Sequence, residues 1–190
     1  MNKKWSTRMM VEGGVMIALA TALSMIPLYK APFGGTITPG SMIPIIVFAM
    51  RWGLVKGLIV GFGYGLIQAA MATTPFLHWA QFFLDYPLAF GALGLSGLAH
   101  NAFKRSLRNN GKSSLVRDYG VAVFAILISI LGRGISHILS GVIFFSEYAG
   151  DMNPWKYSAI YNAQYLVPEF IISIVLIIIL WTPLKKIDME

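Results

Sequence analysis

Long apolar stretches with short polar interruptions dominate this sequence. The two longest, at about residues 119–145 and 157–183, exceed the roughly 20 residues that an α-helix needs to cross a bilayer. Only 12% of the 190 residues are charged and 56% are hydrophobic, whereas soluble domains are about 25% charged. The sequence therefore predicts an all-α integral membrane protein, with residues 1–190 forming a single transmembrane domain.

Six apolar runs predict a six-transmembrane-helix bundle. They cover about residues 9–28, 41–50, a third run that ends near residue 72, and then 79–99, 119–145 and 157–183. The second run is short for a bilayer crossing, so we expect it to be tilted or packed inside the bundle. Lys3, Lys4 and Arg8 in front of the first run imitate a secretory signal. Because that run is long and further spans follow, we expect a retained first helix.

The basic residues are concentrated in alternate connections between the runs. Of the 15 lysines and arginines, only Lys30 and Lys156 fall in connections assigned to the outer side, and Arg133 lies within a run. Positive charge favours the cytoplasmic side, so this pattern predicts a multi-pass protein of the cell membrane with both termini inside. It also explains the net charge of +7 without a nucleic-acid partner. The lack of cysteine excludes disulfides and thiolate metal sites.

A polar and aromatic stripe runs along the fifth apolar run. At about 100° per residue, one quarter of the helix circumference carries Arg133, His137, Gly141, Phe144 and Tyr148. A charged side chain at membrane depth is costly unless it is paired or faces a cavity. We therefore expect the stripe to face inward and to form part of a small-molecule site.

A second polar cluster lies at the start of the fourth run. Asp85 follows Gln81 by one helical turn on the same face, and Tyr86 is beside it. The functional interpretation is that Asp85 receives a cationic or amino-bearing ligand; the alternative is an ion pair with Arg133. Glu169 in the sixth run could serve the site or pair with Arg133. The partner of Arg133 is thus left open between Glu169, Asp85 and a backbone carbonyl.

The connection at residues 29–39, YKAPFGGTITP, contains two prolines and paired glycines. These residues forbid a regular helix. Such a segment would suit a lid over a cavity, although it could also be a simple connector.

Three stretches at characteristic spacings carry a resemblance to a known family. They are FLDYPLAF at residues 83–90, the pair His137 and Gly141 followed by FFSEYA at residues 144–149, and YSAIYN at residues 157–162. In this order they resemble the thiamine-specific S components of energy-coupling factor (ECF) transporters. The resemblance extends over essentially the whole chain, including its length, its six runs and its basic inner connections.

The resemblance implies a subunit that captures thiamine from outside the cell and is not an enzyme. In this family the S component docks through small residues of its first helix onto a transmembrane coupling subunit driven by two ATPases, and it topples so that its site faces inward. Gly14 and Ala18 match the docking position, although small residues are also simply common in membrane helices. No cofactor is expected, since the partner subunits use the ATP. The sequence agrees, because Gly111-Lys112-Ser113 lacks the first glycine of a phosphate-binding loop.

The resemblance also implies a set of substrate-binding residues. They are Asp85, Tyr86, His137, Gly141, Phe145, Tyr157 and Asn162. Asp85 matches the family's acidic group on the aminopyrimidine, but its side chain is shorter than that of glutamate by about one methylene.

The aromatic positions depart from the family pattern. Phe145 stands where a tryptophan is expected, and Gly35 lies near the place of another tryptophan in the first outer connection. The further candidates are Phe33, Trp79 and Trp155, whose rings could compensate, and Glu169.

The chemistry of these side chains suits thiamine. An aromatic face can hold the thiazolium cation by about 0.5–2 kcal/mol, and a carboxylate can accept charge-assisted hydrogen bonds from the aminopyrimidine. Other flat nitrogenous solutes would be suited as well.

Two alternative functions remain: an S component for another vitamin such as riboflavin, which would not need Asp85, and a membrane enzyme that uses Asp85, His137 and Arg133. The sequence argues against an enzyme, because it shows no metal-binding cluster and no nucleophile–base pair at a recognisable spacing.

Overall fold

The computed structural model describes residues 5–73, 76–108 and 115–187. Its elements in chain order are α1 (Thr7–Ser24), β1 (Tyr29–Lys30), η1 (Pro32–Gly34), β2 (Thr36–Ile37), α2 (Ile43–Trp52), α3 (Leu54–Ala70), α4 (Trp79–Phe83), η2 (Leu84–Leu88), α5 (Ala89–Gly91), η3 (Ala92–Ala99), α6 (His100–Arg108), α7 (Leu115–Phe144), η4 (Ser146–Ala149) and α8 (Pro154–Ile187). The element η2 is a π-helical turn, and η1, η3 and η4 are 3-10 helices. The fold is therefore mostly helical, with one short antiparallel hairpin formed by β1 and β2.

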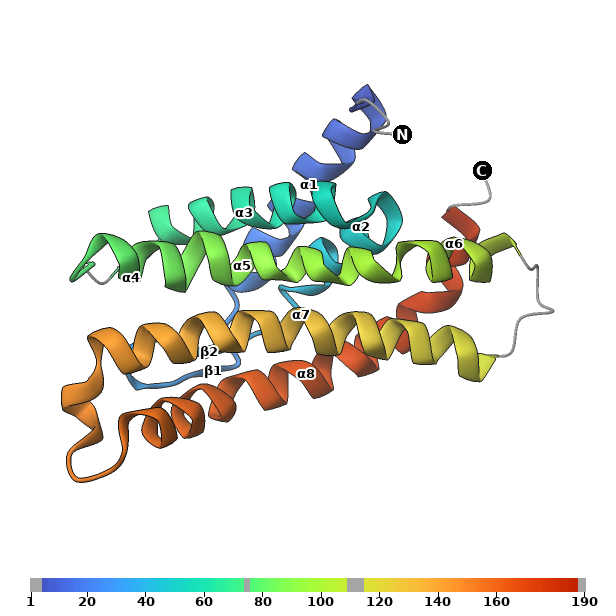
Figure 1. The fold of residues 1–190 in the computed structure, drawn as a ribbon. Coiled ribbons are helices and arrows are strands. Elements are labelled where there is room, and N and C mark those ends of the chain that lie inside the picture. Colours follow the sequence, from blue (N-terminus) through green and yellow to red (C-terminus); the bar gives the residue numbers. More distant parts are fainter. Residues whose placement is uncertain (1–4, 74–75, 109–114, 188–190) are drawn as a thin grey trace.

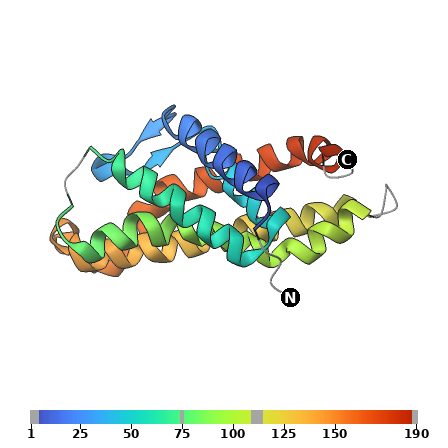
Figure 2. The same ribbon diagram turned by 90° about the horizontal axis from the view of Figure 1, so that it is seen from above.

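The long helices lie side by side. Figure 1 shows α3, the stretch from α4 to α6, α7 and α8 as neighbouring rods, with α1 inclined to them. Helix α7 packs against both α8 and η3, and η3 also packs against α2 and α3. Strand β2 contacts α8, and Figure 2 shows the hairpin near the end of the bundle where α8 begins. The hairpin thus lies alongside the N-terminal half of α8.

Three helical stretches in the described part of the chain are long and apolar enough to cross a membrane. They are Trp79–Arg105, Tyr119–Phe144 and Pro154–Leu180. Helices α2 and α3 are also apolar but shorter. Large apolar side chains such as Leu131, Ile135 and Val167 point outward, as expected for contact with lipid. The molecule is a helical membrane protein.

Helix α2 is enclosed by the rest of the bundle. Its residues Ile45, Ile46, Phe48 and Ala49 are fully buried, and α1, α3, α7, α8 and η3 all contact it. A helix that is apolar on every side is stable only where every side is covered. The short run at residues 41–50 was expected to be either tilted or packed inside the bundle, and packing inside the bundle is confirmed.

The observed helix ends differ from the predicted ones where proline intervenes. Helix α1 ends at Ser24 and not near residue 28, because Pro27 disfavours helical geometry in the residue before it. Helix α8 begins with Pro154 and not near residue 157, since proline is well suited to the first turn of a helix, where its missing N–H is not needed.

The run at residues 79–99 is continuous but is not a regular α-helix. Pro87 lies inside η2 and has no N–H to donate to the carbonyl of Phe83, so the helix widens into a π-turn at this point. Asp85 lies at the start of this π-turn, one helical turn after Gln81 as predicted. Gln81 accepts a hydrogen bond from the backbone N–H of Leu77 at 2.7 Å.

Glycines spaced by four residues bring α3 close to the stretch η2–η3. A Cβ at Gly61 would lie 2.6 Å from the carbonyl oxygen of Phe90, and one at Gly65 would lie 2.6 Å from that of Tyr86. Backbones can approach this closely only where side chains are absent. The glycine face of α3 thus fixes the position of η2.

Candidate functional site

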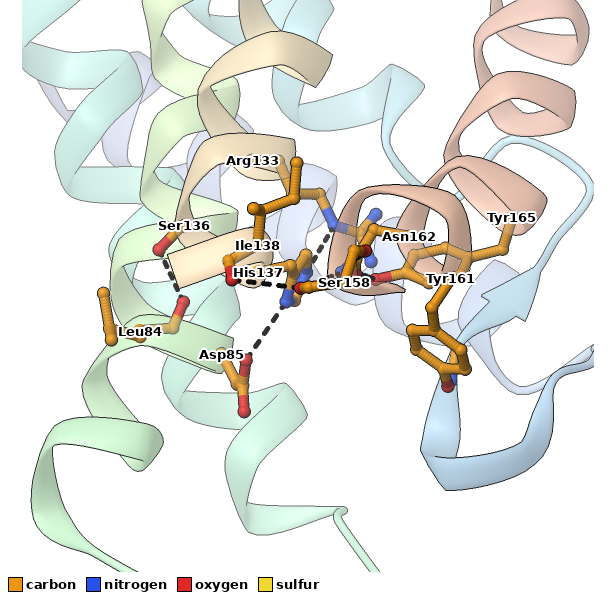
Figure 3. Close-up of polar contacts among 11 residues, drawn as sticks. Leu84, Asp85, Arg133, Ser136, His137, Ile138, Ser158, Tyr161, Asn162 and Tyr165 are labelled. Atoms are coloured by element: carbon orange, nitrogen blue, oxygen red, sulfur yellow. Dashed lines mark hydrogen bonds and ion pairs between the residues drawn. The ribbon is translucent and has the colours of Figure 1, made fainter. Parts of the chain in front are cut away.

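Asp85, His137 and Arg133 form a polar cluster inside the bundle (Figure 3). Nδ1 of His137 lies 3.3 Å from Oδ1 of Asp85, and Nε of Arg133 donates to Nε2 of His137 at 3.2 Å. Arg133 and His137 are one turn apart on α7, and Asp85 comes from η2. The predicted inward-facing stripe and the predicted intramembrane carboxylate therefore meet, and Asp85 contacts His137 and not Arg133.

The π-turn that carries Asp85 is bonded directly to α7. Oγ of Ser136 donates to the carbonyl oxygen of Leu84 at 2.7 Å. These two residues are the chain neighbours of His137 and Asp85. This hydrogen bond from a side chain to the backbone therefore holds η2 against α7 next to the imidazole and the carboxylate.

Within the described residues, the guanidinium of Arg133 has no ion pair or hydrogen bond with Glu169, Asp85 or a backbone carbonyl. Its side chain is buried, with 7% exposure, and besides His137 it contacts Met42 and Phe90. Nη1 lies 3.0 Å from Sδ of Met42, and the guanidinium carbon lies 4.5 Å from the centre of the Phe90 ring. Among the described residues, no carboxylate lies within 4.0 Å of this guanidinium. The sulfur of Met42 and the ring of Phe90 surround the charge where a carboxylate could have been.

The predicted stripe is shorter than expected. Helix α7 ends at Phe144, so Tyr148 lies in η4 beyond the helix and is 53% exposed. Its ring is 6.2 Å from that of Phe145, which directly follows α7. Tyr148 does not continue the inward face, because the chain turns before reaching it.

Helix α8 forms the opposite wall and is bonded closely to α7. A Cβ at Gly141 would lie 3.0 Å from Cβ of Ser158 and would overlap its Oγ, so glycine permits the close approach. Oγ of Ser158 donates to the carbonyl oxygen of Ile138 at 3.0 Å. Nδ2 of Asn162 donates to the carbonyl oxygen of Ser158 at 2.8 Å. Gly141 and Asn162, predicted as binding residues, thus lie at one helix–helix contact.

Tyrosines at every fourth position form a row of rings on α8. The rings of Tyr157 and Tyr161 are stacked with their centres 6.5 Å apart, and Tyr165 meets Tyr161 edge to face at 6.0 Å. Tyr165 also meets the ring of His137 at 6.2 Å, and its hydroxyl donates to Oδ1 of Asn162. Figure 3 shows Tyr161 and Tyr165 of this row on α8, beside Asn162 and the polar cluster.

The hairpin is bonded to the same face of α8. The hydroxyl of Tyr161 donates to the carbonyl oxygen of Pro32 and accepts from the N–H of Gly35 at 3.2 Å. A Cβ at Gly35 would lie 2.6 Å from Cε1 of Tyr165, so the backbone packs directly on that ring. A large side chain cannot be accommodated at residue 35 in this arrangement.

Glu169 is bonded to the end of the hairpin segment. Its side chain is 1% exposed, and Oε1 accepts from the N–H of Thr38 at 2.5 Å and from its hydroxyl at 2.7 Å. Oε2 has no hydrogen-bond partner within the described residues. Of the two roles considered for Glu169, pairing with Arg133 does not occur. Tyr161 and Glu169, which are two helical turns apart on α8, hold residues 29–39 by hydrogen bonds at two points. The role of residues 29–39 as a lid stays a prediction.

The other predicted contacts lie outside the polar cluster. Tyr86 packs edge to face against Phe76, with ring centres 5.5 Å apart. Trp79 and Trp155 are exposed, at 77% and 55%. The side chain of Phe33 is outside the described part of the structure.

Sequence reasoning missed several residues that build the site. Tyr165, Ser158 and Ser136 each contact a predicted site residue or its neighbour. The signal for Tyr165 was present, because Tyr157, Tyr161 and Tyr165 recur every four residues and so share a helix face. The two serines give no such signal, since their hydrogen bonds depend on which helices pack together.

The cluster combines a carboxylate, an imidazole and aromatic rings in a buried setting. A carboxylate suits a flat ligand with an amino group, and aromatic rings suit one with a positive charge. Among residues 5–73, 76–108 and 115–187, no group of three or more His, Asp or Glu side chains could hold a metal ion.

Fold and site together define a helical membrane protein with a polar cluster enclosed in its bundle. A family model described as "Thiamine transporter protein (Thia_YuaJ)" matches residues 10–188. The chain belongs to this family.

Two relatives match nearly the whole chain. The "Thiamine transporter ThiT" of Bacillus subtilis (strain 168) is 34% identical over 184 residues, which are 95% of this chain and 94% of that protein. The "Thiamine transporter ThiT" of Lacticaseibacillus paracasei is 33% identical over 176 residues, which are 90% of this chain and 86% of that protein.

Two solved structures resemble the fold. ThiT from Listeria monocytogenes matches with a TM-score of 0.79 and 27% identity, covering 94% of this chain and 93% of that chain. The "S component of a bacterial ECF transporter" matches with a TM-score of 0.59, covering 96% of this chain and 98% of that chain. At 16% identity, the second likeness shows the fold alone.

Proposed function

We propose that this chain is the substrate-capture subunit of an energy-coupling factor transporter and that it binds thiamine from outside the cell. The family and the names of the relatives support the substrate. The observation that carries the proposal is Asp85: a carboxylate inside a membrane helix, in contact with His137 at 3.3 Å and close to the tyrosine row of α8. This arrangement matches an aminopyrimidine joined to a cationic ring.

The proposed ligand contacts follow the resemblance. They are Asp85, Tyr86, His137, Gly141, Phe145, Tyr157 and Asn162. Asp85 would accept from the aminopyrimidine, and the aromatic rings would face the thiazolium. Phe33, Trp79, Trp155 and Glu169 remain weaker candidates, of which Trp79 and Trp155 would need the outer segments to move because both are exposed.

The proposal includes the arrangement in the membrane. Residues 1–190 would form one domain with six spans in the cell membrane and both termini inside, as the distribution of basic residues supports. A transmembrane coupling subunit and two ATPases would supply the energy, so this chain would use no ATP, carry no cofactor and act as a binding subunit and not as an enzyme.

Equilibrium binding tests the proposal. Thiamine is titrated into the detergent-purified protein while the fluorescence of its five tryptophans is followed, with riboflavin as the control ligand. We expect saturable quenching by thiamine and none by riboflavin. Absence of thiamine binding by a folded sample, or conversion of thiamine into another compound, would contradict the proposal.

The first helix offers a prediction that separates binding from transport. Gly14 and Ala18 are both exposed on α1, and a Cβ at Gly14 would meet nothing within 4 Å. If this face docks onto the coupling subunit, Ala18→Trp should abolish thiamine uptake in cells and leave thiamine binding by the purified protein unchanged. The matched control is Leu19→Trp, an exposed position about 100° around the same helix. Equal uptake by both variants would place the docking surface elsewhere.

A further inference from the structure

Arg133 is buried, and among the described residues no carboxylate lies within 4.0 Å of its guanidinium. A guanidinium at membrane depth is costly unless it has a specific partner. Its nearest polar side chain is His137, at 3.2 Å from Nε. Met42 and the Phe90 ring hold the rest of the group in place. The arginine is therefore fixed so that one N–H points at the imidazole.

This contact determines where the proton of His137 lies. A guanidinium has N–H donors and no acceptor, so Nε2 of His137 must accept from Arg133 with its lone pair. The ring proton is then on Nδ1, which lies 3.3 Å from Oδ1 of Asp85. An imidazole protonated on both nitrogens would place an N–H against the N–H of Arg133.

We infer that Arg133 is a positioning residue that holds His137 in the Nδ1–H tautomer, so that a neutral imidazole donates to Asp85 and leaves its carboxylate charged for the ligand. The inference rests on the proposed function, because it takes Asp85 as the group that receives thiamine. If His137 were instead an imidazolium, its charge would neutralise Asp85 and repel a cationic ligand. Arg133 thus determines the charge that the ligand meets without touching the ligand.

The surroundings of His137 contain the groups that this inference needs. Arg133 on α7, Asp85 on η2 and Tyr165 on α8 face the ring. Tyr165 donates its hydroxyl proton to Asn162 and presents its ring edge to His137. In the described part of the chain, Arg133 is accordingly the one donor aimed at Nε2.

Nitrogen NMR of the histidine side chains tests the tautomer directly. The chain has three histidines, so a ¹⁵N-histidine sample gives few signals, and the His137 signals are those lost in His137→Asn. In the wild type, without thiamine, Nδ1 should be protonated and Nε2 unprotonated. Arg133→Met removes the donors while keeping an apolar side chain against Phe90, and it should move the proton to Nε2. Arg133→Lys retains a donor and should keep the Nδ1–H form.

Thiamine titrations at pH 6 and pH 8 provide the second readout. The wild type should bind with nearly equal affinity at both values. Arg133→Met should bind about tenfold more weakly at both values, as expected for one supporting hydrogen bond to a charged group. Arg133→Lys should restore most of the affinity.

Two results would overturn the inference: an Nε2–H tautomer in the wild type, or an Arg133→Met variant that keeps both the wild-type tautomer and the wild-type affinity. The first requires no variant and decides the matter even if Arg133→Met fails to fold. The predicted tautomer in a wild type that does not bind thiamine would contradict the proposed function and support the positioning by Arg133.

Discussion

Replacing Asp85 with asparagine is expected to weaken thiamine binding by about a hundredfold or more. A hydrogen bond to a charged group contributes about 1.5–3 kcal/mol, each 1.4 kcal/mol is about tenfold in affinity, and the variant also loses the attraction between the carboxylate and the cationic ligand. If the amide turns its NH2 group toward the N–H of His137, two donors face each other across the 3.3 Å contact. The measurement is a fluorescence titration of purified protein.

Two matched variants make this result interpretable. Asp85→Glu keeps the charge and adds one methylene, so it should bind thiamine far better than Asp85→Asn. Asp151→Asn removes a carboxylate from an exposed turn before α8 and should bind like the wild type. If folded Asp85→Asn bound thiamine within about twofold of the wild type, thiamine would be held without the carboxylate, and the proposed role of Asp85 would fail.

The residues of the candidate site could be predicted to lie near one another because helical periodicity and membrane energetics act together. A single helix face carries Arg133 and His137, and the cost of burying charge requires that face to turn inward. The same cost applies to Asp85 on another helix. Two inward-facing polar groups in one small bundle meet, as the 3.3 Å contact between His137 and Asp85 confirms.

The exact geometry of this contact and the partners of Arg133 could not be predicted from helical periodicity. Pro87 converts one turn into a π-turn, and this turn contains Asp85. The partners of Arg133 include Met42 and Phe90, which give no sign of such contacts in the sequence because they resemble ordinary core residues. The sequence left the partner of Arg133 open between Glu169, Asp85 and a backbone carbonyl, but packing places the imidazole next to it.

The close packing of α3 on η3 was also missed, although its signal is visible in the sequence. Gly57, Gly61 and Gly65 recur every four residues on α3, and Gly94 and Gly97 lie on the facing stretch. A Cβ at Gly94 would lie 2.6 Å from Cα of Leu58 and would overlap the backbone atoms of Gly57 and Leu58. Backbone cannot move aside as a flexible side chain can, so the two stretches depend on glycine at this contact.

Gly94→Leu is therefore expected to destabilise the protein by roughly 3 kcal/mol or more, or to prevent its folding, because the side chain must force α3 away from η3. Through α3 the change would also disturb η2 and Asp85. The control is Gly120→Leu, since Gly120 is exposed on α7 and a Cβ there would meet nothing within 4 Å. Thermal unfolding in detergent, with the monodisperse fraction after purification, measures both variants. Similar stability of Gly94→Leu and Gly120→Leu would mean that α3 and η3 can separate at little cost, and that close glycine packing does not hold the Asp85-bearing turn in place.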